Sequence, residues 1–252
     1  AFYQCESLTE VTIPSSVEIA GNQCFTGCKK ITKIQINTDK PNVINFLYAG
    51  EETEGVTVTY AEGLKKAACL YVGSNLKKLI IPDSITQIGD WVFSGCSGLT
   101  ELKLPENLEE IGESAFQGCR GLRRLELPAK LKEVKSSAFY ECTGINYIKI
   151  NSPECKYGGA FEKVGTAEEV REEGLTVEYA EGVTEIGDMY WERANLTHVK
   201  LPESLKKIGE RAFFCCRSLK EIKIPEGVTV IGDTAFYQCE SLTEVTIPSS
   251  VE

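Results

Sequence analysis

The chain has 252 residues, of which 42% are hydrophobic and 25% are charged, and its formal net charge is -10. This mixture is typical of a folded domain and excludes a disordered chain. The acidic balance argues against a nucleic-acid surface, which needs clustered Lys and Arg, and against binding to anionic lipid. The sequence contains no apolar run of about 18 residues, so it predicts no membrane span. Its first residues do not match the pattern of a signal peptide.

Phenylalanine marks a unit that recurs along the chain. Where two copies are consecutive the step is 23 residues, and the copies lie at Phe2, Phe25, Phe93, Phe116, Phe139, Phe213 and Phe236. One unit reads "IGESAFQGCRGLRRLELPAKL" over residues 111–131. A fixed period of this length predicts a solenoid, in which each repeat forms one turn of chain.

An apolar triplet, I-x-I or L-x-L, is the most regular part of the unit. Its last residue falls at Ile13, Ile36, Tyr60, Ile81, Leu104, Leu127, Ile150, Tyr179, Leu201, Ile224 and Ile247. The alternation is that of a strand with one buried face. The sequence therefore predicts eleven strands stacked in one parallel sheet, and the prolines that follow most triplets should end the ladder, because proline has no N–H to donate.

The other arc of each unit begins at Ile-Gly and contains the Ala-Phe pair. The residue after Ile-Gly, or after its equivalent, can cap a helix, and we expect a short helical turn to begin at Asn22, Asp90, Ser136, Asp188 and Asp233, with Glu113 and Glu210 as weaker caps. The Ala, the Phe and the Cys three residues later should point into the core, so that phenyl rings stack from coil to coil.

The unit L-x-x-I-x-I-P-x-x-V-x-x-I-G-x-x-A-F-x-x-C resembles the leucine-rich repeat of the BspA-like class, known from surface proteins of bacteria and some protozoan parasites. Residues 1–36, 76–150 and 196–252 match it closely, and the other turns are degenerate copies. The resemblance implies one leucine-rich repeat solenoid over residues 1–252, with about 11 repeats of about 23 residues, a parallel sheet on the concave face and short helical turns opposite. It also implies an extracellular or cell-surface array that binds host or neighbouring-cell proteins.

Two irregular segments, near 37–57 and 151–176, show that a five-turn block is duplicated. "GVTVTYAEGL" at 55–64 echoes "GLTVEYAEGV" at 174–183, and Asn37 and Asn151 replace the usual proline. In the second segment, Thr166 and Glu169 form a capping-box pattern and Gly174 closes it, which predicts a short surface helix. The irregular segments either bulge from an edge or rim a binding site.

Eleven cysteines suggest disulfides or a metal site. Seven follow the Phe by three residues, and such ladder positions favour free core thiols because a disulfide needs Cβ atoms about 3.8 Å apart. Cys155, off this ladder, is the thiol expected to be most exposed. Zinc sites need clustered Cys and His, but His198 is the only histidine. We therefore expect no metal and no cofactor.

Catalytic motifs are absent from the sequence, which has no nucleophile elbow, phosphate loop or dinucleotide fingerprint. His198 is expected to point outward from a strand, away from any Ser or Cys nucleophile. The sequence therefore favours a chain that is not an enzyme.

Outward positions of the triplets remain as the candidate binding surface. They carry mixed charges, and alternating Lys and Glu on neighbouring strands can simply pair across the sheet. The functional interpretation places partner contact at Tyr147, Lys149, His198 and Lys200, beside the longer irregular segment, with Lys103 and Lys223 on the same face. Three hypotheses stay open: a protein-binding ectodomain, a passive spacer that presents another module, and an enzyme.

The two ends of the chain share a sequence. Residues 1–18 and 235–252 are identical, as expected if the chain is an uncapped piece of a longer array in which a 234-residue unit recurs, or if a junction was engineered. Exposed ends of a solenoid that lacks capping repeats could stack head to tail.

Overall fold

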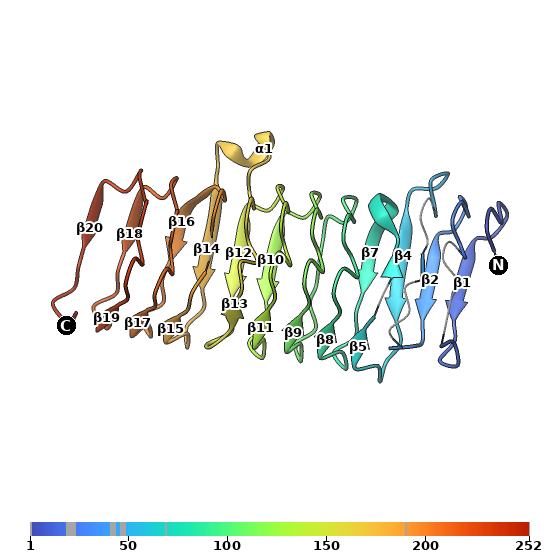
Figure 1. The fold of residues 1–252 in the computed structure, drawn as a ribbon, viewed down its shortest axis with the longest axis horizontal. Coiled ribbons are helices and arrows are strands. Elements are labelled where there is room, and N and C mark those ends of the chain that lie inside the picture. Colours follow the sequence, from blue (N-terminus) through green and yellow to red (C-terminus); the bar gives the residue numbers. More distant parts are fainter. Residues whose placement is uncertain are drawn as a thin grey trace.

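The computed structural model describes residues 2–18, 24–40, 44–45, 49–68, 70–189 and 191–251. The described coils lie side by side along one axis, with the two termini at opposite ends (Figure 1). This arrangement confirms the predicted solenoid, which has about ten turns.

The apolar triplets form parallel strands. Ten of the eleven expected triplets are strands: β1 (Glu10–Ile13), β2 (Lys33–Ile36), β4 (Val56–Tyr60), β7 (Leu76–Ile80), β10 (Arg124–Leu127), β12 (Tyr147–Ile150), β14 (Leu175–Tyr179), β16 (Leu196–Lys200), β18 (Glu221–Lys223) and β20 (Glu244–Thr246). They pair in three groups, β1-β2-β4-β7, β10-β12-β14-β16 and β18-β20. In β1, β2, β4, β10, β12 and β14 inward residues are buried and outward residues are not, as the alternation requires. Val199 on β16 is partly exposed, and Val245 on β20 is exposed.

A second set of short strands was not predicted. β5 (Lys66–Ala67), β8 (Gln87–Ile88), β9 (Glu110–Ile111), β11 (Glu133–Val134) and β13 (Lys156–Tyr157) form one sheet, and β15 (Glu185–Ile186), β17 (Lys207–Ile208) and β19 (Val230–Ile231) form another. A third pair joins β3 (Ile44–Asn45) to β6 (Leu70–Tyr71). These strands have only two residues, which is too short for an alternation to be recognised in the sequence.

The prolines end the ladder, as predicted. Each proline carbonyl then accepts the N–H three residues on, for example from Leu131 to Pro128 at 3.2 Å, and so closes a turn. Where asparagine replaces proline, the ladder gains one rung: Asn151 donates its backbone N–H to Leu127 O at 3.1 Å, and Asn37 does the same to Ile13 O at 2.9 Å. Any residue other than proline can form this rung, as Ala61 and Ala180 do in the following coils, so the rung accounts for the loss of proline.

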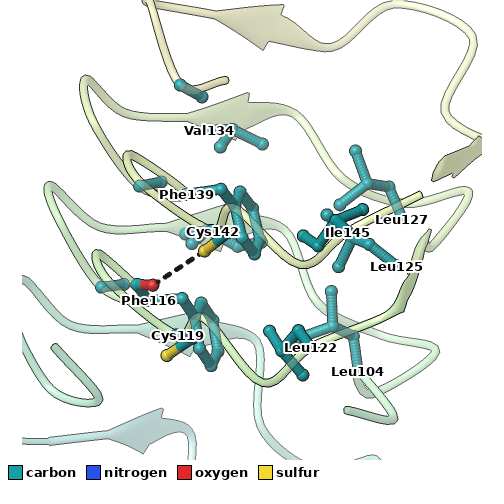
Figure 2. Packing of buried hydrophobic residues seen from close by; sticks show 14 of the residues in the cluster. Leu104, Phe116, Cys119, Leu122, Leu125, Leu127, Val134, Phe139, Cys142 and Ile145 are labelled. Atoms are coloured by element: carbon teal, nitrogen blue, oxygen red, sulfur yellow. Dashed lines mark hydrogen bonds between the residues drawn. The ribbon is translucent and has the colours of Figure 1, made fainter. Parts of the chain in front are cut away.

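The core consists of stacked rings and thiols. Phe93, Phe116, Phe139 and Phe161 are fully buried, and consecutive ring centroids lie 5.3, 5.4 and 5.7 Å apart. Trp191 continues the stack at 5.0 Å from Phe161. Figure 2 shows Phe116 and Phe139 one above the other, with Cys119 and Cys142 beside them. The predicted stack of phenyl rings is therefore confirmed.

The described cysteines are free. On the ladder, Cys28, Cys96, Cys119, Cys142 and Cys216 are buried, which confirms the free core thiols that the sequence favours. The prediction for Cys155 is wrong, because its side chain is 7% exposed. Its segment turns inward and forms β13 next to it, which the irregular sequence did not indicate.

The turns after Ile-Gly are mostly not helical. In the described residues, helix is confined to a 3-10 turn, η1 (Gly73–Asn75), and to α1 (Glu168–Arg171). One expected cap, Asp90, acts between coils instead: its Oδ1 accepts the backbone N–H of Glu113, one coil further on, at 2.8 Å. Asn22 lies outside the described residues.

The short helix near 166–174 is confirmed, but its capping box is wrong. α1 begins after Ala167, which makes no side-chain cap. Thr166 Oγ1 donates to Lys163 O at 3.1 Å, so its hydroxyl serves the preceding turn. Gly174 adopts a positive φ of 73° after the helix, as a closing glycine should.

Both copies of the duplicated block interrupt the sheet at the same place. A bulge lies between Val56 and Thr57, where β4 meets β7, and another lies between Leu175 and Thr176, where β14 meets β16. After each bulged pair the ladder stops: residues 101–104 follow β7 and form no strand, and β18 follows β16 but pairs with β20 instead. In the described part of the chain, residues 100–104 make no main-chain hydrogen bond to either neighbouring coil.

Candidate functional site

The outward side chains of the triplet strands form one surface, here called the sheet face. The register places the predicted site residues in two rows across β12, β14 and β16. Tyr147 aligns with Thr176, which aligns with His198, and Lys149 aligns with Glu178, which aligns with Lys200. Four of the six predicted residues are therefore brought together within three strands.

Tyr147 is held between neighbours on both sides. The guanidinium carbon of Arg124, on β10, lies 4.2 Å from the centroid of the Tyr147 ring. Burial raises the pKa of the Tyr147 phenol, and hydrogen bonding to Glu178 adds to the rise. The phenol therefore stays protonated at neutral pH, and its half-buried ring offers a fixed amphipathic contact area.

The lysines of the second row have acidic partners. Lys149 Nζ lies 3.9 Å from Glu126 Oε1, and Lys200 Nζ lies 3.5 Å from Glu178 Oε2. These ion pairs run across the sheet as the alternation of charge predicted. Exposed pairs of this kind contribute about 0–1 kcal/mol, so a partner can displace them at low cost.

His198 points to solvent, as predicted. Its ring Nδ1 lies 2.8 Å from Thr197 Oγ1, the residue that the bulge inserts into β16. No Ser or Cys nucleophile contacts the ring in the described structure. The described residues contain no group of three or more His, Cys, Asp or Glu side chains able to hold a metal ion.

Lys103 and Lys223 lie apart from this cluster but in equivalent places. Each is exposed, and each occupies the triplet that follows one of the two interruptions of the sheet. Among the described residues, neither lysine forms an ion pair. The equivalence follows from the duplicated block, but the interruptions themselves were not predicted.

Hollows flank Lys103 on both sides. One of about 670 Å³ lies toward β7 and is lined by Lys78, Ile80 and Glu101 among others. Another of about 740 Å³ extends past Glu126 to Asn151 and Glu181. They lie beside the unpaired segment 101–104, so the sheet face is hollowed where the ladder of hydrogen bonds is interrupted. The only signals in the sequence are the short steps of 21 and 22 residues that precede the two interruptions.

No helix among the described residues is long and apolar enough to cross a membrane. The fold and the ladder of phenylalanines define a leucine-rich repeat solenoid, a class that is generally non-catalytic.

The chain belongs to the BspA type leucine rich repeat family, whose model matches six copies over residues 1–59, 66–171 and 174–252. A search of curated proteins finds no match to it. Among solved structures, a leucine-rich repeat protein from Bacteroides ovatus is 24% identical with a TM-score of 0.53, and the alignment covers 100% of this chain and 76% of that one. One from Eubacterium ventriosum is 17% identical with a TM-score of 0.53, over 97% of this chain and 80% of that one. A leucine rich cell surface protein from Faecalibacterium prausnitzii is 23% identical with a TM-score of 0.39, over 94% and 78%.

Proposed function

We propose that this chain is a non-catalytic, adhesin-like repeat domain that binds a protein of a host, a neighbouring cell or the matrix. The observation that supports this most is the pairing of β12, β14 and β16, which sets Tyr147 and His198 in one row with Lys149 and Lys200 beside them. Tyrosine tends to anchor protein interfaces. The core is uniform from coil to coil, so variation is confined to surfaces such as this one.

We infer that the chain lies outside the cell, on a cell surface or secreted, because its repeats resemble the BspA-like class known from surface proteins. Lys103 and Lys223 extend the contact surface along the same face. No cofactor, metal or nucleic acid takes part in this proposal.

The test immobilises the chain and captures matrix and host-surface proteins. A double variant, Tyr147→Ala with His198→Ala, should weaken the capture of the partner by about tenfold or more, as loss of an anchor residue does. A control on the same face, Lys33→Ala with Gln35→Ala, changes the two outward positions of β2 and should bind like the wild type. Equal capture by all three proteins would place the site elsewhere.

A spacer is the second candidate, favoured by the identity of residues 1–18 with 235–252. A rod of repeated coils holds another module at a distance without binding anything itself. Failure of the wild-type chain to retain any partner in the same experiment would favour the spacer. Turnover of a peptide or a glycan would instead revive an enzymatic role.

We also propose that copies stack head to tail. Ile247 is 60% exposed on the last coil and Phe2 is 50% exposed on the first, although equivalent residues inside the array are buried. These apolar side chains would be covered if the last coil of one copy met the first coil of another.

A further inference from the structure

A groove of about 560 Å³ lies at the turns that lead into β16 and β18, beside α1. Its lining includes Ala194, Phe214 and Cys215, here called its floor, and the side chains of Arg171, Arg193 and Arg217. The three arginines come from three different coils. This surface, here called the arginine groove, is separate from the outward strand positions of the sheet face.

A second hollow continues the arginine groove toward the next coil. It has about 410 Å³ and is lined by Arg211, Phe214, Thr234 and Tyr237. The rings of Phe214 and Tyr237 stack with centroids 5.1 Å apart and an interplanar angle of 15°. Tyr237 is 50% exposed, so the stack presents one aromatic surface to solvent.

Arginine side chains are concentrated on this surface. Four arginines and one glutamate, Glu192, line the two hollows together, although the whole chain has a net charge of -10. All seven arginines of the chain lie between residues 120 and 217. Three of the four arginines that line the groove form ion pairs with Glu192, Glu210 and Glu240 at 3.3–3.7 Å. Such exposed pairs contribute little to stability, so these guanidinium groups can change partner.

Part of the groove is ordered by a shared acceptor. Gln238 Oε1 accepts hydrogen bonds from Arg217 and from the Cys215 thiol, both at 3.2 Å. Asn195 Nδ2 donates to Arg171 O at 3.1 Å and ties the end of α1 to the coil below. These contacts orient the Arg217 side chain and fix the backbone at Arg171.

We propose that the arginine groove binds an acidic segment of a partner protein that carries an aromatic or aliphatic side chain. Guanidinium groups bind carboxylates through paired hydrogen bonds, and Arg with Tyr is the composition that dominates binding energy at interfaces. The floor at Ala194 and Phe214 suits an apolar anchor, which a sulfated glycan lacks. The site is independent of the sheet face, and a partner bound to one leaves the other open.

The experiment measures fluorescence anisotropy with a labelled peptide, Glu-Glu-Phe-Glu-Glu-Phe. Arg193→Glu with Arg217→Glu should weaken its binding by about tenfold or more, and added salt should weaken the wild-type complex. Lys132→Glu with Lys207→Glu, at exposed ion pairs outside the groove, is the control for net charge and should have a much smaller effect.

Tyr237 has a control within the chain. Tyr3 lies in the identical stretch of 18 residues and is 56% exposed, but far from the arginines. Tyr237→Ala should weaken the peptide several-fold, and Tyr3→Ala should leave its affinity unchanged. Circular dichroism checks that each variant is folded.

Three results would overturn the proposal. The first is equal binding of a peptide in which both Phe residues are replaced by Glu, which would make the floor irrelevant. The second is equal loss in the groove variant and in the lysine control. The third is a heparin oligosaccharide that binds the groove more tightly than the peptide, which would assign the surface to sulfated glycans.

Discussion

Four thiols of the core ladder, those of Cys28, Cys119, Cys142 and Cys239, join two coils. Cys142 donates its thiol hydrogen to Phe116 O at 3.1 Å (Figure 2), and Cys119 does the same to Phe93 O at 3.2 Å. The cysteine therefore fills a core position and adds a thiol donor to a buried carbonyl that already accepts a backbone N–H, as Phe116 O does from Cys119 at 3.1 Å. Alanine or valine would leave only the backbone donor. This dual role accounts for a cysteine rather than another small apolar residue.

Because the ladder thiols are buried, the free energy of unfolding varies with pH in the alkaline range. Burial raises the pKa of Cys142 from its ordinary value of 9.0 to about 12. The folded chain therefore holds this proton more tightly than the unfolded chain. The stabilisation is complete below pH 9 and is lost progressively as the pH rises from 9 to about 12, by about 1.4 kcal/mol per pH unit.

Urea unfolding at several pH values between 8 and 10.5 measures this effect. The difference in unfolding free energy between the wild type and Cys142→Ala should stay constant up to about pH 9 and then shrink. Lysines and tyrosines that titrate in this range affect both proteins alike, so the difference isolates the thiol. A difference that does not change with pH would contradict the prediction.

At the scale of single residues, the sequence predicts the core well and the irregular segments poorly. The Phe and Cys ladders follow from a strict period, because each coil gives a residue the same surroundings. Cys155 has no equivalent in neighbouring coils, so its burial depends on how the segment 151–157 folds back on the core. No pattern in the local sequence predicts the burial of Cys155.

Among the elements, α1 shows how a loop is fitted to a regular stack. Val170, a residue of α1, is buried. Glu169 Oε1 lies 3.3 Å from a guanidinium nitrogen of Arg123, two coils away. Gly174 then returns the chain to β14 with a positive φ. A Cβ atom on Gly174 would overlap the side chain of Thr197, so this position also needs the absence of a side chain.

Substitutions at Gly174 and Gly182 allow the energetic cost of a left-handed backbone to be measured separately from the cost of a steric overlap. Gly182 also has a positive φ, of 96°, but a Cβ there would meet nothing within 4 Å. Gly182→Ala should therefore lower the unfolding free energy by about 1–2 kcal/mol, the cost of the left-handed conformation. Gly174→Ala should cost about 1–3 kcal/mol more, since Thr197 must also move. Equal losses in urea unfolding of the two variants would show that Thr197 moves without cost.

The strands of the triplets were predictable and the two-residue strands were not. A triplet with proline after it repeats often enough to be recognised, whereas Gln87–Ile88 or Glu133–Val134 look like parts of a turn. The capping box at Thr166 was wrong because a turn that ends at Lys163 competes for the same hydroxyl. Hydrogen bonds between coils generally replace the local ones expected from the sequence.

At the scale of the whole molecule, the duplication organises the sheet face. Both blocks place a bulge and an interruption at the same step, and Lys103 and Lys223 follow the two interruptions. The duplication was visible in the sequence. The interruptions depend on small displacements between packed coils, which the sequence does not encode in any single motif, so the hollows beside Lys103 could not be predicted.

Head-to-tail stacking is testable on the chain itself. Sedimentation velocity at increasing concentration should show a rising weight-average mass, and Phe2→Glu with Ile247→Glu should abolish the rise by charging the exposed apolar ends. Ile80→Glu, on the sheet face at a residue that is 41% exposed, is the control and should associate like the wild type. A wild-type chain that stays monomeric at millimolar concentration would contradict the proposal.

The contacts of each coil reach mainly the coil before it and the coil after it, so within residues 1–252 the first and last coils contact one neighbour each. Val245 and Ile247, which are core positions by sequence, are already exposed in the last coil. Amide hydrogens should therefore exchange with solvent fastest at the two ends and slowest around Phe116 and Phe139, and fraying should proceed inward coil by coil.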